Sequence, residues 1–137
     1  MTIVWDGVVT ADDWRAHLRE MFADPDWPVG SKNLTDLRTA DVSTITPEDR
    51  ASIVTMYAPY ADKVRGQKSA AVAGDNFDAS REFEDQKEPA GLSLIVFNDL
   101  LNACTWLGID KAVAQATVSE LRQELRDQAA SRLADTD

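Results

Sequence analysis

The segment WDGVVTADDW, residues 5–14, decides the fold, because it runs from a short apolar stretch straight into the start of a helix. Thr10 followed three residues later by Asp13 has the form of a capping box, which predicts the first turn of a helix after a strand. The same pattern occurs twice more, in NLTDLR (33–38) with TPED (46–49) and in VFND (96–99) with ACTWLG (103–108). Repeated strand–helix units predict an α/β domain with a mainly parallel sheet of about four strands and flanking helices.

The composition is typical of an ordinary globular domain, and its charge is strongly acidic. The chain has 137 residues, with 14 Lys and Arg against 24 Asp and Glu, which gives a formal net charge of -10. Such a surface repels nucleic-acid phosphates and anionic membranes, so we expect no nucleic-acid partner. We find neither a basic leader at the start nor an apolar stretch of the ~20 residues that a spanning helix needs. The sequence therefore predicts a cytoplasmic protein without integral membrane contact.

Turn and cap residues place the individual elements. We expect strands over residues 2–9, 31–37, 68–74 and 92–97, joined by helices. A bend or bulge is expected at Gly7, and the second helix, which begins at Thr46, should kink or break into two short helices at Pro59. Asn98 is expected to cap the helix that ends at Gly108. Residues 75–88 are heavily charged and predict a weakly packed helix.

The last segment predicts a long polar helix from Asp110 to Leu133. Its apolar stripe is narrow and consists of Ala114, Val118, Leu121, Leu125, Ala129 and Leu133. Such a stripe is equally compatible with lying on the domain and with pairing two copies as a homodimer through residues 110–133. We therefore divide the chain into an α/β part, residues 1–108, and a helical extension of the same domain, residues 109–137.

The best candidate for a binding site is the carboxyl end of the strands. In open α/β sheets, ligands bind beyond these ends, near helix N-termini that attract anions. The candidate ligand- or partner-binding residues there are Asp36, Arg38, Ser43, Thr46, Gly74 and Asn98. Each has an alternative explanation as a capping or turn residue, which every α/β protein needs.

Catalytic and metal-binding patterns are not found in the sequence. His17, the one histidine, is expected on the first helix as a surface or partly packed residue, and Cys104 as a small buried apolar residue. We therefore predict no catalytic residue, no metal and no cofactor. Among the tryptophans, Trp5, Trp14 and Trp106 are expected in the core, whereas Trp27 lies in a proline-rich loop and is the candidate for lining a groove.

Several short motifs resemble those of bacterial STAS-like proteins, the small SpoIIAA-like domains related to anti-sigma-factor antagonists and, more distantly, to CRAL-TRIO lipid-binding domains. The residues that carry the resemblance are GVVTADD (7–13), DPDW (24–27), DLR (36–38), TPED (46–49), SAAV (69–72), VFND (96–99) and ACTWLG (103–108). The resemblance covers roughly residues 3–108. It implies the STAS-like fold and says little about activity.

The resemblance implies a non-catalytic regulatory module. Such a module would bind a small ligand, with lipid-like molecules among the candidates, or a regulatory protein near the carboxyl ends of the strands. The alternative is a phospho-regulated switch like the anti-sigma antagonists, with Thr46 or Ser43 as the phosphoacceptor. The antagonists carry their acceptor serine in an Asp-Ser-Ser-Gly-like turn, whereas the matching stretch here reads Ser-Thr-Ile-Thr-Pro (43–47).

Overall fold

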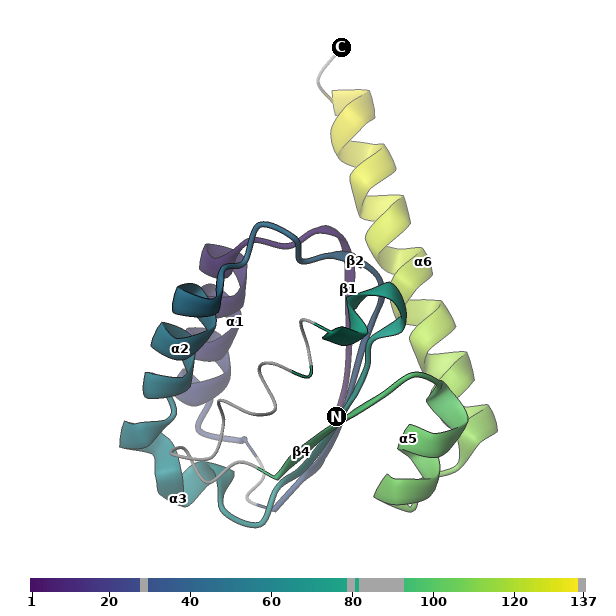
Figure 1. Ribbon diagram of the computed structural model, residues 1–137. Coiled ribbons are helices and arrows are strands. Elements are labelled where there is room, and N and C mark those ends of the chain that lie inside the picture. Colours follow the sequence, from purple (N-terminus) through teal and green to yellow (C-terminus); the bar gives the residue numbers. More distant parts are fainter. Residues whose placement is uncertain (28–29, 79–80, 82–92, 136–137) are drawn as a thin grey trace.

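Four parallel strands form the central sheet in the order β1-β2-β3-β4. The strands are β1 (Thr2–Val8), β2 (Lys32–Asp41), β3 (Lys68–Val72) and β4 (Leu94–Phe97). The computed structural model describes residues 1–27, 30–78, 81 and 93–135 (Figure 1). The predicted α/β class with a parallel sheet, flanking helices and a long final helix is confirmed.

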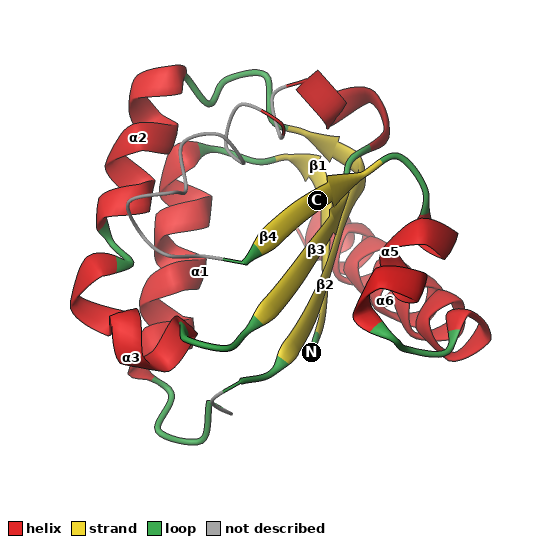
Figure 2. Cartoon of the chain, turned by 60° about the horizontal axis from the view of Figure 1, so that its bottom comes forward, coloured by secondary structure: helices red, strands yellow, loops and turns green. Residues whose placement is uncertain are grey.

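Helices cover both faces of this sheet (Figure 2). On one face lie α1 (Ala11–Ala23) and α2 (Pro47–Thr55), with the short helices η1 (Ala58–Tyr60) and α3 (Ala61–Val64) after them. Because crossovers between neighbouring parallel strands are right-handed, two successive crossovers in one direction place their helices on the same face. The other face carries α5 (Leu100–Leu107) and α6 (Lys111–Asp135). A further short helix, η2 (Gly74–Asn76), follows β3.

The predicted starts of α1 and α2 are confirmed. The Thr10 side chain accepts a hydrogen bond from the Asp13 backbone N–H at 3.1 Å, and the Asp13 carboxylate accepts one from the Thr10 N–H at 2.9 Å. Thr46 and Asp49 form the same box at 3.0 and 3.1 Å. The break at Pro59 is also confirmed, because α2 ends at Thr55 and the chain continues as the short helices η1 and α3.

The second strand is longer than the sequence predicts. We expected it to end at Leu37 and to be followed by a polar link, but β2 continues to Asp41 and pairs with β1 as far as Val8. The polar residues 38–41 lie on this strand because β1, at the edge of the sheet, extends beyond β3 and supplies backbone partners. The register shifts between Val4 and Asp6, next to the predicted bend at Gly7, whose φ is +73°.

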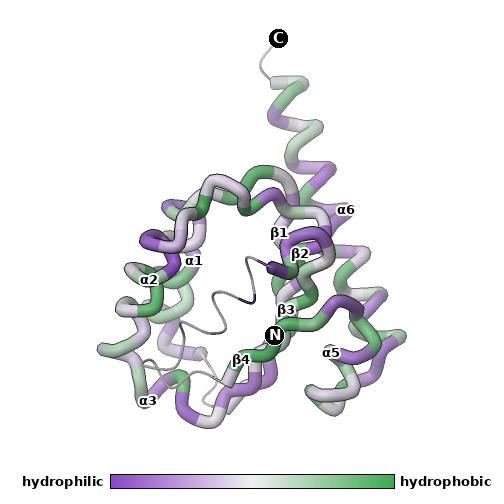
Figure 3. Tube along the Cα trace, viewed as in Figure 1, coloured by the Kyte–Doolittle hydropathy of each residue, from purple (hydrophilic) through white to green (hydrophobic). Residues whose placement is uncertain are grey.

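Two apolar clusters fix the layers. One lies between the sheet and α5 and α6 and includes Leu34, Val72, Leu107 and Val118. The other joins α1, α2 and α3, with Ile53 at its centre. Figure 3 shows hydrophobic residues along α5, the helix that contributes Leu100, Cys104 and Leu107 to the first cluster. As expected, β3 is an interior strand of small residues, and α5 packs directly against it.

Only the first half of α6 packs on the domain. Ala114 and Val118 are buried against the sheet, whereas Leu133 is 72% exposed and the end of the helix projects beyond the other elements (Figure 1). Of the two arrangements expected for the apolar stripe of this helix, packing on the domain is therefore correct for its first half. Most of the predicted helix over residues 75–88 lies outside the described residues. Within the described part of the chain, no helix combines the length and apolar character needed to cross a membrane.

Candidate functional site

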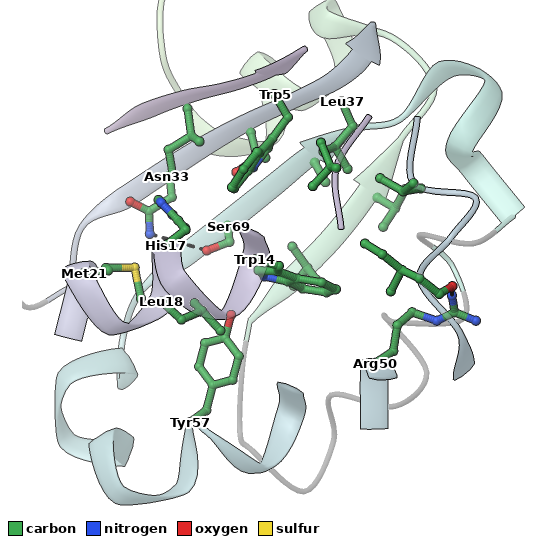
Figure 4. Close-up of a pocket in the computed structure, with 18 of the residues that line it drawn as sticks. Trp5, Trp14, His17, Leu18, Met21, Asn33, Leu37, Arg50, Tyr57 and Ser69 are labelled. Atoms are coloured by element: carbon green, nitrogen blue, oxygen red, sulfur yellow. Dashed lines mark hydrogen bonds between the residues drawn. The ribbon is translucent and has the colours of Figure 1, made fainter. Parts of the chain in front are cut away.

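A cavity of about 180 Å³ lies between the sheet and the layer formed by α1 and α2 (Figure 4). Side chains alternate between the two faces of a strand, so every second residue of each strand points toward it. Its floor is formed by Ile3 and Trp5 of β1, Asn33, Thr35 and Leu37 of β2, Ser69 and Ala71 of β3, and Leu94 and Val96 of β4.

Helix spacing supplies the opposite wall. Trp14, Leu18 and Met21 recur at intervals of four and three residues, so one face of α1 borders the cavity. His17 lies on the same helix and meets the Trp5 ring edge to face, with ring centroids 5.3 Å apart. Tyr57, which follows α2, completes this wall (Figure 4). The lining is thus largely aromatic and aliphatic.

Polar groups gather where the chain enters β2 and β3. The Asn33 side-chain amide donates a hydrogen bond to Ser69 Oγ at 3.4 Å, and Ser31 Oγ donates to Asn33 Oδ1 at 3.3 Å. Trp27 and Gln67 lie just before the same two strands and are only 7% and 6% exposed. Both side chains line the cavity, and both Trp27 Nε1 and Gln67 Nε2 are buried without a hydrogen-bond partner among the described residues.

Burial decides the charge state of the ionisable groups around the cavity. Desolvation lowers the pKa of His17, with Glu20 opposing the shift weakly, so the imidazole is neutral at pH 7. Desolvation raises the pKa of Tyr57, so its hydroxyl stays protonated. Arg50 is buried at the cavity wall and donates to the Ile45 carbonyl at 3.1 Å. This arrangement offers apolar contact and hydrogen-bond donors, which are the means of binding a small molecule.

Two of the sequence-predicted site residues lie on the opposite face of the sheet. Asp36 is fully buried there and accepts hydrogen bonds from Arg38 on β2 and from Arg122 on α6, both at 2.8 Å to Oδ2. Arg122 also donates to Thr39 Oγ1 at 3.1 Å. Between Asp36 and Thr39, β2 contains one residue more than the paired part of β1, which turns both side chains toward α6.

The remaining predicted residues have local roles. Gly74, with φ +55°, lies against Arg38, where an added Cβ would come within 3.4 Å of the arginine Cγ. The Ser43 backbone N–H donates to Asp41 Oδ1 at 2.9 Å. Thr46 caps α2. The structure thus brings Asp36, Arg38 and Gly74 together, and none of the six predicted residues is among the described residues that line the cavity.

The prediction for Asn98 is wrong: it does not cap α5. Asp99 is the N-cap, and its carboxylate accepts a hydrogen bond from the Asn102 backbone N–H at 2.8 Å and another from the Asn102 side chain. Asn and Asp are about equally good N-cap residues, so their order in the sequence left the choice open. Asn102, three residues after Asp99, favours the aspartate as the cap because its side-chain amide donates a second hydrogen bond to that carboxylate.

Sequence reasoning found one residue of the cavity and missed most of it. Trp27 was expected to line a groove and does so, whereas Trp5 and Trp14, expected in the core, also border the cavity. The signal that could have revealed the cavity is the presence of polar residues on covered strands. Asn33 of β2 and Ser69 of β3 point toward the cavity, whereas the next residue of each strand is buried on the other face of the sheet. An inward polar side chain on a covered strand needs a partner, which indicates a polar site inside the domain.

Other reactive groups of the described chain do not assemble into a centre. No group of three or more His, Cys, Asp or Glu side chains among the described residues is placed to hold a metal ion. Cys104 is buried in α5, as expected, and burial raises the pKa of its thiol, so the reactive thiolate is disfavoured.

Together, the fold and the cavity define a class: a three-layer α/β domain with an aromatic-lined cavity between its sheet and one helical layer. Comparison with protein families, with curated proteins and with solved structures gives no match for this chain.

Proposed function

We propose that this protein is a non-catalytic STAS-like module that binds a small, largely apolar ligand in the cavity between the sheet and α1. The observation that carries this proposal is a cavity of about 180 Å³ between the sheet and α1, lined by Trp5, Trp14 and Trp27. Well-packed domains contain few voids larger than a water molecule, and voids of this kind weaken the packing around them. A cavity of this size among aromatic side chains is better explained by an occupant than by imperfect packing.

The volume limits the size of the ligand. An apolar protein cavity of ~150 Å³ admits benzene. The space here is slightly larger, at about 180 Å³. The ligand we propose is therefore a molecule with a single ring or a short branched chain, rather than a full-length acyl chain. The flat walls supplied by Trp14 and Tyr57 favour an aromatic ring.

A phospho-regulated switch is supported less well. Thr46 Oγ1 already accepts a hydrogen bond from the Asp49 backbone N–H, and the Asp49 carboxylate accepts one from the Thr46 backbone N–H. A phosphate on this oxygen would stand beside the acids Glu48 and Asp49 and break the cap, although the helix N-terminus itself attracts anions. A role for Ser43 or Thr46 as phosphoacceptor stays a hypothesis.

The first experiment is native mass spectrometry of gently purified protein, followed by extraction and identification of any bound molecule. We expect a stoichiometric small apolar ligand. Thermal unfolding with added cumene then tests the cavity directly, because a ligand that binds only the folded state raises the melting temperature.

A filled cavity provides the control for that experiment. Ala71 is 6% exposed and lines the cavity, so Ala71→Met should occupy the space and abolish the effect of cumene. The exposed Ala112→Met on α6 is the matched control and should keep it. An empty protein whose melting temperature does not respond to cumene would contradict the proposal and favour a protein-docking module.

A further inference from the structure

Two buried donors have no hydrogen-bond partner in the part of the chain that the structure describes, and they indicate the chemistry of the ligand. Trp27 Nε1 and Gln67 Nε2 are both more than nine-tenths buried, line the cavity, and have no hydrogen-bond partner among the described residues. Buried polar groups in folded proteins are nearly always hydrogen-bonded, because a donor taken out of water without a new partner destabilises the fold. Two such exceptions in one cavity call for a common explanation.

The two donors belong to neighbouring loops. Trp27 lies in the loop before β2, and Gln67 in the loop before β3. These loops touch, since the Lys68 backbone N–H donates to the Ser31 carbonyl at 3.1 Å and a Cβ on Gly66 would lie 3.9 Å from the Gly30 Cα. Both donors therefore border the end of the cavity at which β2 and β3 begin.

The nearby polar groups do not satisfy these donors. Asn33 is engaged with Ser69 and Ser31. The Lys63 ammonium, close to the same end of the sheet, donates to the Phe22 carbonyl at 2.7 Å. Among the described residues, no acceptor oxygen is hydrogen-bonded to Trp27 Nε1 or Gln67 Nε2, and the indole N–H can only donate.

We propose that the ligand of this cavity carries a carbonyl-type acceptor oxygen that Trp27 Nε1 and Gln67 Nε2 bind, while its apolar body lies among Trp5, Trp14 and Leu18. This inference rests on the proposed function, since it names the chemical class of the ligand in the same cavity. Carbonyl oxygens accept two hydrogen bonds, which matches the two donors. The ligand class is therefore a small aryl or branched-alkyl ketone, ester or amide.

Two probes of similar size separate the acceptor from the apolar body. Acetophenone and cumene differ in that a carbonyl oxygen replaces a methyl group. A titration followed by the indole N–H signals in ¹H–¹⁵N spectra should give an affinity for acetophenone about tenfold higher than for cumene, as expected when the carbonyl gains hydrogen bonds from buried donors. The Trp27 indole proton should move downfield with acetophenone and not with cumene.

Matched variants assign the effect to the two donors. Gln67→Met and Trp27→Phe each remove one donor and keep an apolar group, so each should lower the preference for acetophenone. The double variant should bind cumene more tightly than acetophenone, because the carbonyl oxygen would then be buried without a donor. Trp106→Phe, on α5 and outside the cavity lining, should keep the full preference. Cumene binding reports in each variant whether the cavity is still formed.

The outcomes are distinct. Equal affinity of the unaltered protein for the two probes, or a preference that survives the double variant, overturns the acceptor proposal and leaves the proposed function standing. If neither probe binds the unaltered protein, both the acceptor proposal and the proposed function fail.

Discussion

Asp36 is a charged residue with no exposed surface, and two arginines from different elements explain how it is tolerated. Burial alone would raise the pKa of its carboxyl group. The hydrogen bonds from Arg38 and Arg122 outweigh that effect and hold the pKa below its usual value. The carboxylate is thus ionised at neutral pH and joins β2 to α6. A pair of this kind contributes little compared with apolar packing, but its disruption leaves a buried charge.

The first prediction concerns the two arginines of this cluster. Arg122→Met should lower the free energy of unfolding by about 2 kcal/mol, because Arg38 still neutralises the carboxylate. Adding Arg38→Met should bring the total loss to about 4 kcal/mol or more, since the carboxylate is then buried without a cation. Urea unfolding at pH 7 followed by circular dichroism measures both. Arg126→Met, at an exposed position of the same helix, is the control. If Arg122→Met lowers the free energy of unfolding no more than this control, the ion pair does not hold α6 on the sheet.

The second prediction is a loss of stability in acid that depends on Asp36. Because its pKa is lower in the folded than in the unfolded chain, the unfolded chain binds more protons and stability rises with pH across this range. The contribution is complete above about pH 4, the usual range of an aspartate, and is lost as the pH falls through the lowered pKa. Free energies of unfolding between about pH 5 and pH 2 should therefore fall less steeply in Asp36→Asn than in the unaltered protein.

Other carboxylates set the remaining slope of that profile. Hydrogen bonds from Ser43 lower the pKa of Asp41, and those from Thr46 lower the pKa of Asp49, so both contribute in the same direction and keep their effect in Asp36→Asn. Two profiles of the same slope would mean that Asp36 does not titrate in this range.

The predicted and observed N-cap residues agree for α1 and α2 and differ for α5. The boxes at Thr10 and Thr46 are recognisable because the acid stands three residues after the cap, so the signal is local. At residues 98 and 99 two good caps stand side by side, and the choice depends on how β4 leaves the sheet.

The third prediction follows: Asp99→Ala should lower the free energy of unfolding by about 1 kcal/mol, and Asn98→Ala by less than about 0.5 kcal/mol. The reverse order in chemical unfolding would restore Asn98 as the cap.

The same distinction between local and long-range signals explains what could be predicted of the site. Strand alternation and capping are local, so the parallel sheet and its helices follow from the sequence. The cavity depends on which faces of β1, β2 and α1 meet, and Trp5 and Trp14 have the spacing of ordinary core residues. The partner of Asp36 is Arg122, 86 residues away, and only the packing of α6 on the sheet brings them together.

At the scale of the whole molecule, α6 divides into a packed and a projecting part. Residues up to Leu125 include the buried Val118 and the ion-paired Arg122, whereas residues 126–134 are exposed. The fourth prediction is that a chain ending at residue 125 unfolds within about 0.5 kcal/mol of the full chain, because the exposed residues removed contribute little. A chain ending at residue 120 loses Leu121 and Arg122 and should be less stable by about 2 kcal/mol or more.

Sedimentation of the full chain and of the chain ending at residue 125 decides between the two alternatives for the apolar stripe of α6, which are lying on the domain and pairing two copies. If Ala129 and Leu133 pair two copies, the full chain sediments as a dimer and the chain ending at residue 125 as a monomer, and the shorter chain is then clearly less stable at equal concentration because dimerisation stabilises the folded state. If α6 serves only its own domain, both sediment as monomers and unfold alike. A dimeric full chain would contradict the fourth prediction and assign residues 126–133 to an interface between copies.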